Sequence, residues 1–163
     1  MSERRDPFLA PDHDAREVAA SLLSSARTAA LAVLHPAART PYVTLIALRW
    51  LDGAPVTLVS DLSIHTQALR ADPKAGLLIS QPPEKGDPLN AARLSLSVTA
   101  RFVTTDDPQR PAIRDAWRAA HPKSAIYIDF ADFHFVRFDI LGGHLNGGFA
   151  RAFALTAQDL KLS

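Results

Sequence analysis

The 163-residue chain contains no cysteine, and this absence excludes several kinds of chemistry at once. Without a thiol there is no disulfide, no thiolate nucleophile, no iron–sulfur cluster and no cysteine-ligated zinc. The six histidines do not compensate, because they are scattered and show no spacing typical of metal ligands. We therefore expect no metal site built from protein side chains alone.

The chain also lacks an excess of charge and a long apolar run. Its 18 basic and 17 acidic residues leave a formal net charge of +1. This balance gives no electrostatic reason to bind nucleic acid, and no basic run points to an anionic membrane. No apolar run approaches the ~20 residues that a spanning helix needs, and the N-terminus has no signal-peptide core. We expect no nucleic-acid or membrane partner, and a cytoplasmic location.

Familiar catalytic motifs are missing as well. The sequence has no Walker loop, no Gly-x-Gly-x-x-Gly and no Gly-x-Ser-x-Gly elbow. It offers no obvious acid–base pair either. Any redox chemistry would therefore depend on a cofactor that the protein positions and tunes.

What is present is the pattern of one mainly β (α+β) domain covering residues 1–163, with residues 1–11 as a flexible arm. Alternation of apolar and polar residues is clearest over Arg93–Thr105. An antiparallel barrel or sandwich with few helices follows. Strands are expected at 29–34, 42–51, 56–60, 75–80, 93–105, 133–141 and 149–155, and helices at 12–26, 62–71, 106–120 and 156–160.

The stretch from Pro41 to Gln81 is the most informative. Asp52-Gly53 separates two β-rich runs, which predicts a hairpin. Hydroxyls and a histidine then gather where a helix begins, and a helix N-terminus favours an anion such as phosphate. An alternative is open, because Ser63 or Asp61 could simply cap the helix.

The order of these motifs resembles the pyridoxamine 5′-phosphate oxidase-like, FMN-binding split-barrel family. The segment Ser60…Ser63-x-His65-Thr66-Gln67-x-Leu69, followed by Asp72-Pro73, carries much of the resemblance. The tail from His144 to Ala152 resembles the branch of that family linked to haem utilisation. The resemblance implies a six-stranded antiparallel split β-barrel with flanking helices.

The resemblance also implies a function, namely an FMN-binding oxidoreductase that acts on a small-molecule substrate. It implies a homodimer with FMN at the subunit interface. The implied FMN contacts are Thr44, Leu45, Ser60, His65, Thr66, Gln67 and Arg93. His65 stands where some relatives have lysine, which makes the phosphate site less positive.

Two alternatives stay open at this point. One is a haem-binding or haem-degrading protein of the same fold, and the other is a non-catalytic flavin-binding module. The residues expected at the pocket or at haem are Arg49, His144, Gly147 and Gly148. His144 is the tail residue suited to ligate iron, whereas the glycines have a structural alternative as a β-bulge or turn.

Overall fold

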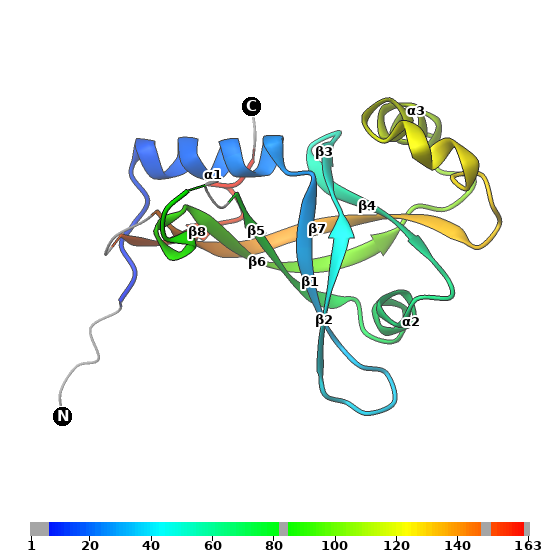
Figure 1. The fold of residues 1–163 in the computed structure, drawn as a ribbon, viewed down its shortest axis with the longest axis horizontal. Coiled ribbons are helices and arrows are strands. Elements are labelled where there is room, and N and C mark those ends of the chain that lie inside the picture. The colour runs from blue at the N-terminus through cyan, green and yellow to red at the C-terminus, as the bar shows by residue number, and fades with distance from the viewer. Residues whose placement is uncertain (1–6, 82–84, 148–150, 162–163) are drawn as a thin grey trace.

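The computed structural model describes residues 7–81, 85–147 and 151–161, and it shows a curled antiparallel sheet with helices against it (Figure 1). The helices are α1 (His13–Ser25), α2 (Ile64–Ala71) and α3 (Arg110–Ala120), with short 3-10 turns η1 (Pro88–Asn90) and η2 (Pro122–Ile126). The strands are β1 (Thr28–Leu34), β2 (Pro41–Ala47), β3 (Arg49–Leu51), β4 (Ala54–Ser60), β5 (Lys74–Ser80), β6 (Arg93–Phe102), β7 (Phe133–Asn146) and β8 (Ala152–Thr156).

The sheet confirms the predicted split barrel, with more strands than the six expected. Its order is β2-β1-β5-β6-β7-β4-β3, and β8 pairs with β7. The expected strand 42–51 is interrupted at Leu48, which gives β2 and β3. Asp52 and Gly53 both have positive φ, 50° and 77°, as a tight hairpin turn between β3 and β4 requires.

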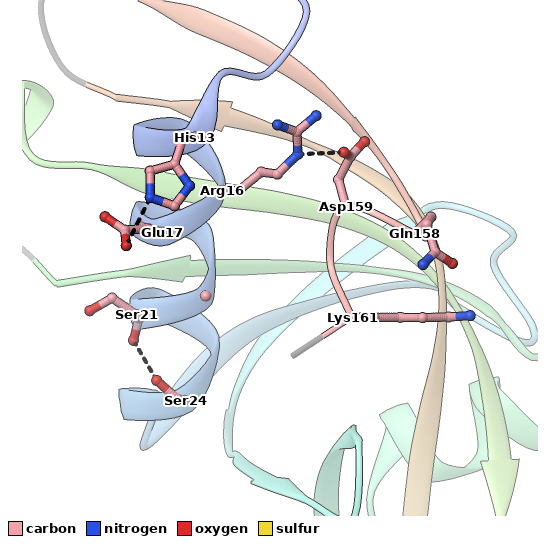
Figure 2. A pocket seen from close by; sticks show the side chains of 9 residues that line it. His13, Arg16, Glu17, Ser21, Ser24, Gln158, Asp159 and Lys161 are labelled. Carbon is pink, nitrogen blue, oxygen red and sulfur yellow. Dashed lines mark hydrogen bonds and ion pairs between the residues drawn. The ribbon is translucent and has the colours of Figure 1, made fainter. Parts of the chain in front are cut away.

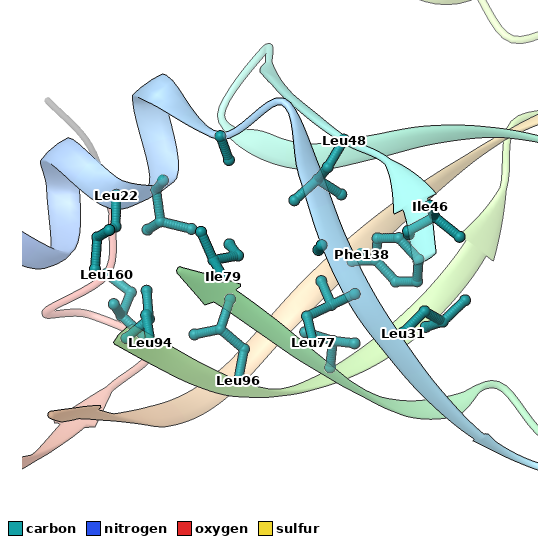
Figure 3. Packing of buried hydrophobic residues seen from close by; sticks show 14 of the residues in the cluster. Leu22, Leu31, Ile46, Leu48, Leu77, Ile79, Leu94, Leu96, Phe138 and Leu160 are labelled. Atoms are coloured by element: carbon teal, nitrogen blue, oxygen red, sulfur yellow. The ribbon is translucent and has the colours of Figure 1, made fainter. Parts of the chain in front are cut away.

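The main core lies on the inner face of this sheet. Alternate residues of β1, β5 and β6 point inward, among them Leu31, Leu77 and Leu94. Helix α1 covers one end of this face with Ala15, Ala19, Leu22 and Leu23, as Figure 3 shows around Leu22. Of the two aspartates able to cap this helix, Asp12 and Asp14, Asp12 does so by accepting a hydrogen bond from the amide of Ala15 at 2.8 Å.

A second, smaller core lies under α3, at the end of the sheet that is farthest from α1 (Figure 1). Trp117 and Ile113 from α3 pack there with Phe135 of β7 and Val56 of β4. This second core holds α3 against the short β3–β4 hairpin.

Strand β7 does not end before Gly142-Gly143, although the sequence predicted a strand that ends at residue 141. The strand continues to Asn146, and its register shifts opposite Ser97–Val98, so that the bulge lies just before Gly142. A Cβ on Gly143 would stand 2.6 Å from the carbonyl oxygen of Ser95. Glycine is therefore needed at position 143 because two backbones approach closely there.

The two ends of the chain also differ from the expectation. Leu9, within the expected flexible arm, exchanges hydrogen bonds with β8: its amide donates to Ala152 O at 2.8 Å and its carbonyl accepts from Ala154 N at 3.1 Å. Thr156 ends β8, and residues 157–160 form a turn and not the expected helix. None of the helices in the described ranges is both long and apolar enough to cross a membrane.

Candidate functional site

The outer face of the sheet is the face opposite the main core. Residues opposite each other in an antiparallel sheet share a face, so the register defines rows across the strands. One row runs from Leu45 through Ala30, Leu78 and Ser95 to His144. The next row is Val43, Ala32, Gly76, Ser97 and Gly142. These ten residues are called the outer sheet face below.

The outer sheet face is open and largely apolar. Leu45 is 72% exposed, Val43 63% and Leu78 40%. The residues between these larger side chains are alanine, glycine or serine, so little projects above the backbone there. A contiguous exposed apolar surface of this kind marks a place where a ligand or a partner binds.

His144 lies at one end of this face. Four strand spacings of about 4.8 Å separate it from Leu45 along the row, or roughly 19 Å. Its side chain is exposed, and its ring stacks on Phe8 with the centroids 4.1 Å apart. The contacts of Leu9 with β8 hold the segment that carries Phe8 in place. Stacking on Phe8 therefore holds an accessible imidazole at the border of the apolar outer sheet face.

Arg93 lies beside His144 and not beside the predicted phosphate segment. It pairs with Asn146, and its position on the same face makes it a diagonal neighbour of His144, with the Cβ atoms about 7 Å apart. Helix α2 is at the other end of β5, six residues or roughly 20 Å away. One Arg93 nitrogen, Nη1, donates to the carbonyl of Leu89 at 2.8 Å. Within one chain, Arg93 and His65 therefore do not meet.

The polar groups that precede α2 are largely paired with one another. Ser60 donates from Oγ to Asp132 at 3.1 Å and accepts from the amide of Leu62 at 3.2 Å. Asp61 bonds to His134 at 2.8 Å and to Arg70 at 2.9 Å. The hydrogen bond with His134, followed by that from Arg70, lowers the pKa of the Asp61 carboxyl. These contacts stabilise the chain reversal between β4 and α2 and place a carboxylate near the expected phosphate position.

The first turn of α2 offers donors but little charge. Ser63 occupies the N-cap position without a capping hydrogen bond from its side chain, so the capping alternative is wrong for Ser63. Burial lowers the pKa of His65, which keeps its ring neutral at pH 7. Thr66 is buried, and its hydroxyl has no partner among the described residues, while Gln67 is exposed. A phosphate would find hydrogen-bond donors here but no free cation in this turn.

The remaining predicted residues have separate places. Thr44 and Leu45 lie on β2, the edge strand beyond β1, so part of their backbone polar groups face away from the sheet. Arg49 lies on β3 beneath α3. Gly147 donates its amide to Arg151 O at 2.8 Å and so closes the β7–β8 hairpin. Gly148 lies outside the described residues.

A cavity of about 660 Å³ lies between α1 and the C-terminal turn (Figure 2), and none of the predicted site residues lines it. Four of its five titratable lining side chains form ion pairs with one another. Arg16 donates to Asp159 at 2.8 Å and His13 lies 3.3 Å from Glu17. Hydrogen bonds from Thr156 and Arg16 lower the pKa of Asp159 to about 2. The cavity is therefore a hollow beside surface ion pairs, and Lys161 is the one lining charge that has no ion pair among the described residues.

The chain also matches a known protein family. The chain matches the family described as CREG, β-barrel, over residues 11–159. It belongs to that family. The CREG β-barrel shares its split-barrel architecture with the pyridoxamine 5′-phosphate oxidase-like proteins, so the resemblance stated from the sequence is confirmed.

Three known proteins are similar to this CREG β-barrel chain in sequence or in structure. The chloroplastic heme oxygenase HOZ of Arabidopsis thaliana is 40% identical over 102 residues, 63% of this chain and 30% of HOZ. A heme binding protein from Mycobacterium smegmatis is 29% identical with a TM-score of 0.81, covering 94% of this chain and 61% of that one. A pyridoxamine 5′-phosphate oxidase-type protein from Listeria innocua, at 12% identity and TM-score 0.62, covers 82% and 98% and shares the fold alone. The chain thus spans about a third of HOZ and three fifths of the mycobacterial protein.

Proposed function

We propose that this protein binds haem on the outer sheet face, with His144 as the protein ligand to iron. The observation that carries the proposal is the row from Leu45 to His144, an exposed and largely apolar surface that ends in an accessible imidazole. Haem is planar and largely apolar, and histidine is among its common protein ligands. The surface therefore has the shape and the ligand chemistry that haem needs.

The relatives support haem ahead of FMN. Two relatives with substantial identity, at 40% and 29%, are named for haem chemistry, and a third, at 28% identity, is described as a protein of unknown function. The proteins named for flavin or pyridoxamine chemistry are 12–13% identical and share the fold only. The order of the two cofactors expected from the sequence is therefore reversed in our proposal.

The residues of the outer sheet face have separable roles in this proposal. His144 holds the metal, and Phe8 keeps the His144 ring in position by stacking. Leu78, two strand spacings or about 10 Å from His144, contacts the apolar face of that haem and excludes water from it. Leu45 and Val43 lie roughly 19 Å or more from His144 of the same chain, so they contact a haem whose iron is held by His144 of a second copy. Bound haem would supply one-electron and oxygen chemistry, and the protein would supply binding, orientation and access.

FMN binding is our second candidate, and it is favoured by the α2 turn. The Thr66 hydroxyl is buried without a partner, and the free edge of β2 presents backbone groups at Thr44 and Leu45. Against it stand the neutral His65 and the nearby Asp61 carboxylate. An FMN-dependent oxidoreductase is the expected activity in that case, and a flavin-binding module without turnover is the alternative.

Assembly belongs to the same proposal. A second copy of the chain that covers part of the outer sheet face would bury Leu45 and Val43 and enclose a ligand at the interface. The homodimer, the small-molecule substrate and the cytoplasmic location all stay predictions.

Titrations with haem and with FMN, followed by absorption spectroscopy, test the proposal. We expect saturable haem binding near one per chain, and at least a tenfold loss of affinity in Leu45→Glu. Val18→Glu is the matched control, because Val18 is also an exposed apolar residue but lies on α1. Sedimentation of the same variants separates a loss of haem from a loss of the dimer.

Two results would overturn the proposal. One is the absence of any haem spectrum in the wild-type protein. The other is saturable FMN binding near one per chain with no haem binding, which would restore the flavoprotein hypothesis.

A further inference from the structure

We infer that Arg27, Arg49, Trp117 and His121 form a subsite for an anionic group, a carboxylate or a phosphate, at the end of the outer sheet face. The existence of the subsite follows from these residues alone. Only the identity of the ligand that brings the anion rests on the proposed function. None of these residues except Arg49 was predicted from the sequence to be part of a site.

Three segments bring the four side chains together. Arg27 precedes β1, and its carbonyl accepts a hydrogen bond from the amide of Leu48 at 2.9 Å, next to Arg49 in the chain. Helix α3 packs against β3, which carries Arg49. The small core that contains Trp117 packs against Leu51 at the end of the same strand. The ring of His121 lies 4.4 Å from that of Trp117, between centroids, at an angle of 32°.

Three nitrogen atoms of this cluster are buried without a partner. They are Nε of Arg49, Nε1 of Trp117 and Nε2 of His121, and none has a hydrogen bond among the described residues. Trp117 itself is 2% exposed. A buried donor that is left unpaired is costly, and most such groups in native proteins have a partner. Unpaired donors from two separate elements therefore point to a missing acceptor.

The charges agree with an anionic acceptor. Arg16, Arg70, Arg114 and Arg151 each pair with a carboxylate, whereas no carboxylate pairs with Arg27 or Arg49 in the part of the chain that the structure describes. Burial lowers the pKa of His121, and the charges of Arg49 and Arg27 lower it further. Two guanidinium groups beside a neutral imidazole and an indole N–H present positive charge and donors but no competing negative group.

The position of the subsite suits an acidic group at the rim of a planar ligand. Leu45 is open on the outer sheet face, and Ala47, two residues further on β2, already packs against the core beneath α3. Arg49 follows directly beyond this boundary. A ligand that lies on Leu45 can therefore extend a carboxylate toward Arg49. Haem carries such carboxylates as its propionates, and a haem that lies on Leu45 is one whose iron is held by His144 of a second copy, because His144 of the same chain is roughly 19 Å from Leu45.

The test compares haem with its dimethyl ester, in which both propionates are neutral. We expect Arg49→Gln to weaken haem binding about tenfold and to leave binding of the ester unchanged. Trp117→Phe, which retains an aromatic ring but removes the N–H, is expected to weaken haem binding by a smaller factor. Arg118→Gln is the matched control, because Arg118 is an exposed arginine on the same helix as Trp117. Circular dichroism verifies that each variant is folded.

A second arm uses inorganic phosphate as the probe and does not depend on haem. We expect phosphate to raise the melting temperature of the wild-type protein more than that of Arg49→Gln. If phosphate does so while haem fails to bind, the subsite stands, the haem proposal falls, and a phosphorylated ligand is indicated. If Arg49→Gln and wild type respond alike to haem and to phosphate, the subsite is wrong whatever the outcome for haem.

Discussion

The two faces of the sheet carry similar side chains and have opposite surroundings. Leu77 and Leu78 are neighbours on β5, but Leu77 is 2% exposed in the main core and Leu78 is 40% exposed on the outer sheet face. The inner face is covered by α1 and by the curl of the sheet itself. The outer face has no such cover over β2, β1 and β5 among the described residues. Apolar residues on both faces of a strand mean that something must cover the second face, and here the fold leaves that role to a ligand or a partner.

The same comparison applies to the polar groups. Around Ser60 and Asp61 the side chains pair with one another, and they thereby stabilise the turn before α2. Around Arg49 and Trp117 the buried nitrogens have no partner within the described ranges. Polar groups that satisfy each other support the fold, whereas those left unpaired in the free protein are the stronger candidates for binding.

The largest effect should come from the inner face. Leu77→Ala removes a buried side chain and is expected to lower the free energy of unfolding by about 2–5 kcal/mol. Leu78→Ala is expected to cost less than about 1 kcal/mol, because its side chain is already partly in water. Urea denaturation measures both. Equal losses for the two variants would mean that the outer face is as much a part of the core as the inner face.

A smaller loss is expected where β6 and β7 approach. Gly143→Ala places a Cβ 2.6 Å from Ser95 O and 2.8 Å from a methyl of Leu96, which forces a local shift. We expect the free energy of unfolding to fall by about 1–3 kcal/mol. Gly147→Ala is the control, since a Cβ there makes only ordinary contacts at 3.7 Å or more. A stable Gly143→Ala protein would show that the register of β7 can shift without cost.

On the outer face the effect should be on binding and not on stability. His144→Ala is expected to weaken haem binding at least tenfold, about 1.4 kcal/mol, and to change the Soret band because the iron loses its protein ligand. His13→Ala serves as the control, since His13 is an exposed histidine on α1. An unchanged spectrum in His144→Ala would remove His144 from the site while leaving the apolar surface as the binding face.

The smallest effect concerns the paired groups before α2. Hydrogen bonds from His134 and Arg70 lower the pKa of Asp61 in the folded protein. A depressed carboxyl pKa adds stability above the unfolded value of about 3.9, and that stability is lost as the pH falls through the folded pKa. The free energy of unfolding of Asp61→Asn should therefore fall less steeply below about pH 4 than that of the wild-type protein. His134→Gln, which can still donate to Asp61, should retain part of the slope, and thermal melting against pH measures both.

The sequence determined most of the fold. Period-2 patterns, the Asp52-Gly53 turn and the Asp12 cap are local signals, and each formed the element that it predicted. Local patterns failed where distant segments meet. Gly142-Gly143 looked like the end of a strand because glycine breaks local structure, but β7 needs Gly143 for the close approach of β6. Leu9 joined β8 through backbone hydrogen bonds that no periodicity in an isolated arm can reveal.

The candidate site, like the fold, could be predicted only in part from the sequence. The sequence, through its resemblance to a family, predicted His144, Leu45 and Arg49 as site residues, and its local pattern placed the hydroxyls at the start of α2. Only the tertiary structure decided that Arg93 stands beside His144 and not beside His65, because the register of β5, β6 and β7 sets which residues share an end of the sheet. It also decided that Trp117 and His121 lie near Arg49, since α3 returns to β3 across some seventy residues of chain. Spacing along the chain reports on neighbours within one element, whereas burial and pairing between elements depend on how the elements pack.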